Sequence, residues 1–140
     1  MVREAIGAEP RFVLDDRELR RGGPSYTLDT VRELQAEQPD VRWFLVIGQD
    51  QYAGLHTWNG WPELLQRVTL AVANRPGPAL RVDPQVQAAA AQAVPLPMLD
   101  VSSTGIRARL AAGKSIADLV PAGVARYIDQ HRLYRDSRRS

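Results

Sequence analysis

Apolar residues occur along this chain in short blocks that are separated by turns. Two blocks, at residues 43–47 and 68–73, are continuous, which is typical of strands buried on both faces of a parallel sheet. Shorter blocks at residues 11–14 and 98–101 predict two further strands, and the second of these is the last in the chain. The hydrophobic pattern therefore indicates a chain built around a sheet.

Segments with helical spacing lie between the predicted strands. Leu28, Val31 and Leu34 recur at intervals of three and predict an amphipathic helix that begins near Ser25 or Thr27. We expect further helices over residues 61–65, 85–93, 106–112 and 122–131. Because strands alternate with helices, the expected fold class is α/β, with right-handed crossovers and a parallel sheet.

Polar motifs follow three of the predicted strands, at residues 48–50, 74–75 and 102–104. Ligands of open parallel sheets bind beyond the carboxyl ends of the strands. We therefore expect the three motifs to line one ligand cleft.

The third motif places hydroxyl groups where a helix is expected to begin. Ser103 and Thr104 stand at that point, and Arg107 follows one turn later. Free backbone N–H groups, the helix dipole and a guanidinium together suit a phosphate. The alternative is that Ser103 or Thr104 only caps the helix.

Each of the other candidate residues also has two interpretations. Gly48 lets a ligand approach the backbone, and the Asp50 carboxylate could accept hydrogen bonds from ribose or could cap a helix. Arg75 could reach a phosphate or lie solvated on the surface. Trp58 could stack on a planar heterocycle or pack on the core, whereas Trp61 is expected to pack.

Several short motifs occur in one order along the chain, and together they resemble the bacterial nicotinate-nucleotide adenylyltransferases of the nucleotidyltransferase superfamily. They are SYTLDT at 25–30, IGQD at 47–50, HTW at 56–58, NRPG at 74–77, VSSTGIR at 101–107, and YI with LYR at 127–135. The resemblance covers nearly the whole chain, from about residue 1 to residue 135. It implies a Rossmann-like sheet and adenylyl transfer from ATP to nicotinate mononucleotide in NAD biosynthesis.

The resemblance also implies roles for residues of this chain. The nicotinate nucleotide would be held by Thr27 and Trp58. ATP and its phosphates would be held by Gly48, Asp50, Arg75, Ser103, Thr104 and Arg107. Magnesium is expected to arrive with the ATP phosphates, because no cluster of side chains here has metal-ligand spacing.

One departure from the family is the glycine-rich segment GGxFDPxHxGH, whose histidines meet the ATP phosphates. The 140 residues do not contain it, and their two histidines, His56 and His131, lie in other contexts. The chain therefore resembles the C-terminal two thirds of such an enzyme, and we assign no catalytic residue. Without that segment, one alternative is a truncated, non-catalytic nucleotide-binding protein. A second alternative is an enzyme resembling phosphopantetheine adenylyltransferase, a superfamily relative with a similar ATP-side motif.

Composition narrows these expectations further. The 140 residues, 44% hydrophobic and 24% charged, suit one domain over residues 1–135 followed by a basic tail at 136–140. A net charge of +2 is too small to argue for nucleic acid, and no apolar run approaches the ~20 residues of a membrane span. The chain has no cysteine, so we expect a cytoplasmic protein without disulfides. Without the family's first strand the sheet would have an open edge. An open edge can pair with another copy of the chain, so a homo-oligomer is one expected option.

Overall fold

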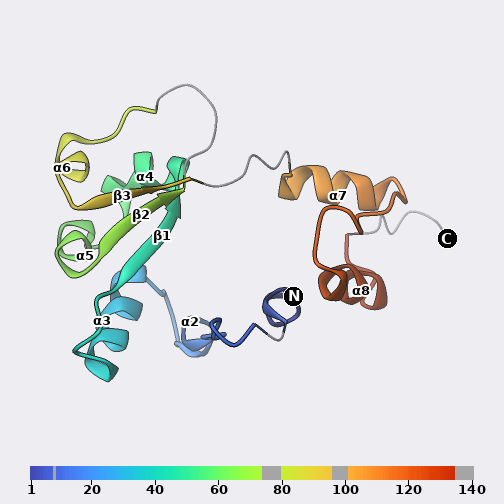
Figure 1. Ribbon diagram of the computed structural model, residues 1–140, viewed down its shortest axis with the longest axis horizontal. Helices are drawn as coiled ribbons and strands as arrows, with labels where there is room; N and C mark the ends of the chain where they lie inside the picture. Colours follow the sequence, from blue (N-terminus) through green and yellow to red (C-terminus); the bar gives the residue numbers. More distant parts are fainter. Residues whose placement is uncertain (8, 74–79, 96–100, 135–140) are drawn as a thin grey trace. The chain divides into compact units, whose positions relative to one another are not determined.

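The computed structural model of the protein describes residues 1–7, 9–73, 80–95 and 101–134. The chain divides into two compact units, and each is described by itself (Figure 1). Residues 16–98 form the first, which we call the sheet unit. Residues 1–15 and 99–140 form the second, which we call the helical unit.

The sheet unit holds the elements α2 (Arg17–Arg20), α3 (Thr27–Glu37), β1 (Phe44–Gly48), α4 (Gln49–Gly54), the 3-10 helix η1 (Leu55–Thr57), α5 (Trp61–Arg67), β2 (Thr69–Ala73), α6 (Pro84–Gln87) and β3 (Ala91–Val94). The helical unit holds α1 (Val2–Ile6), α7 (Ser103–Ala111) and α8 (Ala122–Gln130). The helices predicted to begin near residues 27, 61, 103 and 122 are therefore confirmed.

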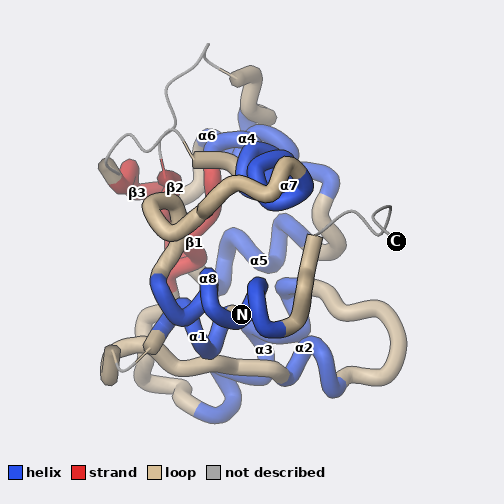
Figure 2. The backbone as a smooth tube through the Cα atoms, turned by 90° about the vertical axis from the view of Figure 1, so that its right-hand side faces the viewer, coloured by secondary structure: helices blue, strands red, loops and turns tan. Residues whose placement is uncertain are grey.

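Within the described residues the sheet has three strands in the order β1-β2-β3, and all pair in parallel (Figure 2, red). In the register, Gly48 at the end of β1 lies opposite Ala73 at the end of β2, and Ala73 lies opposite Val94 of β3. The predicted α/β class with a parallel sheet is confirmed. The carboxyl ends of all three strands meet at one edge.

The core of the sheet unit lies on one face of the sheet. Ile47 of β1 and Leu70 and Val72 of β2 point to that face, since side chains alternate along a strand. The helices that cover it contribute Leu28, Val31, Leu55, Leu64 and Val86, of which the last three are fully buried. Both α3 and α5 are thereby held against the sheet by apolar contacts.

The prediction that β1 is buried on both faces is wrong for one of them. Phe44 and Val46 alternate with the core residues, and their side chains are 40% and 69% exposed. The interior of β2, the central strand of the three described, is buried as predicted. A continuous apolar run thus predicted the strand correctly but did not reveal that one of its faces is exposed.

Two other predictions of elements need correction, and a third stays mostly untested. Residues 11–14 form no strand, although all four are described; Val13 is 88% exposed, and no strand pairs with the segment to satisfy its backbone. The helix predicted over residues 85–93 is only the single turn of α6, and its second half is β3, whose backbone completes the sheet. The strand predicted at 98–101 falls mostly outside the described residues, and Val101 is not in a strand.

The helical unit has its own small core. Ile116, Val124 and Ile128 are buried in it, and the partly buried Ile106 and Leu110 of α7 pack against them. The chain's first helix lies against α8, because a side chain at Gly123 of α8 would come within 3.1 Å of the Glu4 carbonyl of α1. Both ends of the chain therefore build one unit.

Candidate functional site

The carboxyl end of β1 carries the first candidate motif. Gly48 ends the strand and forms the N-cap of α4, and the space beside its Cα is open, since a Cβ at this position would have no other heavy atom within 4 Å. Asp50 lies in the first turn of α4, and its side chain is exposed. Since Gly48 holds the N-cap position, the alternative interpretation of Asp50 as the cap is wrong.

Arg75, the second candidate, lies outside the described residues. Its motif follows β2, whose last residue, Ala73, pairs with Gly48. The role of Arg75 therefore stays a prediction.

Thr27 and Trp58 belong to segments that one close contact brings together. Thr27 is the first residue of α3, and Leu28 after it packs against Gly60, two residues beyond Trp58. Gly60 has φ +64, and a Cβ at this position would overlap the Leu28 Cδ2 atom. The first turn of α3 is thus seated on the turn between Trp58 and α5.

The backbone at the start of α3 is suited to an anion. Tyr26 is the N-cap residue, and its side chain makes no capping hydrogen bond. The Tyr26 carbonyl accepts from the amides of Asp29 (3.0 Å) and Thr30 (3.3 Å), which leaves the earlier N–H groups pointing out of the helix. A carboxylate would satisfy these donors and the helix dipole.

Trp58 is half-buried and packs against the core of the sheet unit, as Trp61 does. The packing interpretation is therefore confirmed for both indoles. Part of Trp58 remains accessible, so packing on one side leaves a stacking role on the other as a prediction.

A network of charged and amide groups ties α3 to α5. Arg32 of α3 donates to Glu63 of α5 (3.1 Å from Nε), and Arg67 of α5 donates to the same carboxylate (2.7 Å). Gln35 of α3 and Arg67 are joined twice, through the Arg67 carbonyl (2.8 Å) and the Gln35 amide oxygen (3.0 Å). The hydrogen bond from Arg32, followed by that from Arg67, lowers the pKa of Glu63 to about 2.

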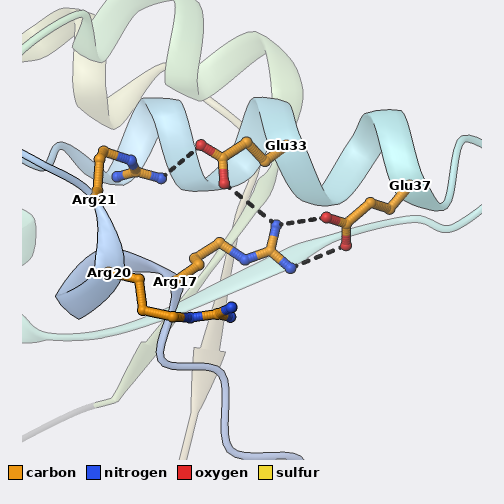
Figure 3. Close-up of a pocket in the computed structure, with 5 residues that line it drawn as sticks. All are labelled: Arg17, Arg20, Arg21, Glu33 and Glu37. Atoms are coloured by element: carbon orange, nitrogen blue, oxygen red, sulfur yellow. Dashed lines mark hydrogen bonds and ion pairs between the residues drawn. The ribbon is translucent and has the colours of Figure 1, made fainter.

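A second charged cluster lies where the segment before α3 meets that helix (Figure 3). It surrounds a cavity of about 350 Å³ and consists of Arg17, Arg20, Arg21, Glu33 and Glu37. Arg17 pairs with Glu37 at 2.9 Å, and Arg21 pairs with Glu33 at 2.8 Å. These residues belong to no motif, and the one signal for them in the sequence is the density of charge at residues 15–21.

The third candidate motif lies in the helical unit. Ser102, not Ser103 or Thr104, caps α7: its Oγ accepts a hydrogen bond from the Gly105 amide at 3.0 Å. The capping interpretation of Ser103 and Thr104 is therefore wrong, and both hydroxyls are exposed in the first turn. Arg107 is exposed and reaches back toward that turn, where its Nη2 lies 3.4 Å from Thr104 Oγ1.

The histidines have other partners. The Nδ1 of His56 lies 3.2 Å from the Ala53 carbonyl, and the Nδ1 of His131 lies 2.9 Å from the Tyr127 carbonyl, with its ring stacked on Tyr127. Over the described ranges, His, Cys, Asp and Glu form no group of three that could hold a metal ion. In the same ranges no helix is both long and apolar enough to cross a membrane.

Comparisons with known proteins show which fold this architecture belongs to. The cytidylyltransferase-like family matches residues 1–109. Two solved structures of the nicotinic acid mononucleotide adenylyltransferase of Plasmodium falciparum, complexed with NaAD and with APC, share the fold, with TM-scores of 0.62 and 0.63 at 18% and 17% identity. They align with 79% and 81% of this chain and with 58% and 60% of their own. The fold is that of a nucleotidyltransferase.

Curated relatives give a finer assignment. The probable nicotinate-nucleotide adenylyltransferase of Methylibium petroleiphilum is 51% identical over 99% of this chain and 68% of its own length. That of Albidiferax ferrireducens is 42% identical over 96% of this chain and 70% of its own length. The chain belongs to the nicotinate-nucleotide adenylyltransferase family, and it spans about 70% of the length of these two relatives.

Proposed function

We propose that this chain binds nicotinate mononucleotide and ATP for adenylyl transfer in NAD biosynthesis. The observation that carries the proposal is the seating of Leu28 on Gly60. That contact brings an uncapped helix N-terminus, which suits a carboxylate, next to the turn that carries Trp58, whose indole suits a pyridine ring. Nicotinate is a pyridine carboxylate, so Thr27 and Trp58 would hold its two ends.

Further residues are assigned to ATP. Gly48 and Asp50 would hold the nucleotide sugar, and Arg75 a phosphate. In the helical unit, Ser103, Thr104 and Arg107 would bind phosphate oxygens; the orientation of Arg107 toward its own helix N-terminus supports this. That the three motifs share one cleft stays a prediction. Mg²⁺ would be carried by the ATP phosphates rather than by protein side chains.

The proposed reaction requires that the two substrates be aligned and that developing negative charge be stabilised. A phosphate oxygen of nicotinate mononucleotide forms a bond to the α-phosphorus of ATP, and the bond from that phosphorus to the oxygen bridging to the β-phosphorus breaks. Nicotinate adenine dinucleotide and pyrophosphate leave. The substrate supplies its own nucleophile, so the protein contributes orientation and positive charge at the developing oxyanions.

The turnover of these 140 residues is a separate prediction. Donors that meet the transition state contribute about 3–4 kcal/mol each, and the family's histidine motif is absent from the sequence. The two histidines of the chain, His56 and His131, lie outside any such motif. We therefore expect binding of both substrates with very slow release of pyrophosphate, which is the non-catalytic alternative.

Two measurements test the proposal. Isothermal titration of the chain with nicotinate mononucleotide, and separately with a non-hydrolysable ATP analogue and Mg²⁺, should each give saturable binding. Binding of neither nucleotide would overturn the proposed function. Pyrophosphate release at rates typical of enzymes, above about 1 s⁻¹, would overturn the expectation of slow turnover but would support the assigned reaction.

A further inference from the structure

We propose that Arg21 is a positioning residue that holds the start of α3 in its binding geometry and thereby sets the affinity for the pyridine nucleotide. This inference rests on the proposed function. It concerns a residue that makes no assigned contact with substrate, and it follows from what surrounds its side chain.

The Arg21 guanidinium lies between the two segments that meet at the start of α3. It donates to Ser25 Oγ on the segment that enters the helix. It also donates to Thr30 Oγ1, at 3.3 Å from Nη2, and to Glu33 Oε1, at 2.8 Å, on the helix itself. Arg21 therefore joins both sides of Tyr26 and Thr27, where the chain changes from extended to helical backbone.

The surroundings of Arg21 show that this arrangement is built rather than incidental. Its side chain is only 18% exposed, although it stands on the unit's surface. Thr30 is fixed in turn by donating its own hydroxyl proton to Glu18 Oε1 at 2.7 Å. Three acceptors at different directions suit a planar guanidinium with five N–H groups, and an ammonium cannot reach all of them.

Arg17 provides a matched control. It has nearly the same exposure, 16%, and also pairs with Glu33, at 3.6 Å. Its stronger partner, Glu37, lies at the other end of α3 (Figure 3). Both arginines therefore tie the segment before α3 to the helix. Arg21 donates to Ser25 and Thr30, which flank Thr27, whereas Arg17 makes a two-pronged pair with Glu37.

The experiment compares Arg21→Lys with Arg17→Lys in the full chain. We expect Arg21→Lys to weaken nicotinate mononucleotide binding about tenfold, the scale of a lost charged hydrogen bond. The affinity of Arg21→Lys for the ATP analogue should not change. Arg17→Lys should change neither affinity. Equal losses in the two variants, or a loss for both nucleotides, would show a general stability effect and overturn the inference.

A second readout needs no ligand. The amides of Asp29 and Thr30 depend on the position of the Tyr26 carbonyl, so their hydrogen exchange reports the geometry of this turn. Exchange should be faster in Arg21→Lys and unchanged in Arg17→Lys. If the unmodified chain binds no nicotinate mononucleotide, the proposed function fails, and unaltered exchange in Arg21→Lys would overturn the positioning role independently.

Discussion

The side chain of Leu28 lies where the β-carbon of any residue other than glycine at position 60 would stand. Gly60 has a positive φ of +64 and caps α5, and Leu28 is 4% exposed. Gly60 is therefore required for two reasons. Its positive φ favours glycine, and its contact with the buried Leu28 leaves no room for a β-carbon. Through this contact the start of α3 is held beside the turn that carries Trp58.

Gly60→Ala should therefore destabilise the sheet unit. The added methyl group would displace Leu28 and would strain the backbone, each at a cost of about 1–3 kcal/mol. The measurement is urea unfolding followed by tryptophan fluorescence, since all three tryptophans lie in this unit. Gly54→Ala is the control: Gly54 has φ −90 and open space around its Cα. Equal stability of the two variants would contradict the packing described.

Glu63 should make the pairing of α3 and α5 sensitive to acid. Its pKa falls from 4.5 in the unfolded chain to about 2 in the folded one, because Arg32 and Arg67 stabilise the carboxylate. The Glu63 carboxylate thus binds a proton less readily in the folded state than in the unfolded state. The stability that its two ion pairs contribute is therefore complete above pH 4.5 and is lost as the pH falls toward about 2.

Glu63→Gln should remove that part of the acid dependence. Urea midpoints of the variant and of the unmodified chain should differ most above pH 4.5 and converge as the pH approaches 2. A constant difference over this range would show that Glu63 titrates alike in the folded and unfolded states.

Ser102→Ala should weaken the start of α7 by about 1 kcal/mol, the usual value of a lost N-cap. The Gly105 amide would lose its acceptor. Thermal unfolding followed by far-ultraviolet circular dichroism measures the effect. Ser103→Ala is the matched control and should change stability by less than about 0.5 kcal/mol. The reverse order of the two variants would assign the cap to Ser103.

Arg107→Lys should weaken binding of the ATP analogue about tenfold, because a point charge cannot reproduce a bidentate guanidinium. The affinity for nicotinate mononucleotide should not change. Arg109→Lys is the control on the same helix, since its guanidinium donates to the Ser115 carbonyl at 2.9 Å and lies near Asp118. An unchanged affinity in Arg107→Lys would remove Arg107 from the phosphate site.

The sequence predicted elements wherever a local signal decided the structure. The spacing of Leu28 and Val31 defined the buried face of α3, and the hydroxyl residues before Gly105 marked the start of α7. Residues 85–93 were misassigned because alanine and glutamine favour helix locally, whereas pairing with β2 decides in favour of strand at Ala91–Val94.

The candidate site was predictable in its residue types more than in its contacts. The resemblance identified Thr27 and Trp58, but the link between them depends on Leu28 and Gly60, which are 32 positions apart. Nor could hydroxyl residues alone reveal that Ser102, rather than its two neighbours, makes the capping hydrogen bond. Arg21 had no motif of its own, since its role comes from three partners that only the folded chain assembles.

In the proposed function, the sheet unit holds the pyridine end of nicotinate mononucleotide against Trp58. The most direct measurement is a fluorescence titration of a chain in which Trp43 and Trp61 are replaced by Phe, so that Trp58 is the reporter. Nicotinate mononucleotide should quench the emission saturably, and phosphopantetheine should not. Quenching by phosphopantetheine alone, or no change with either ligand, would contradict the account.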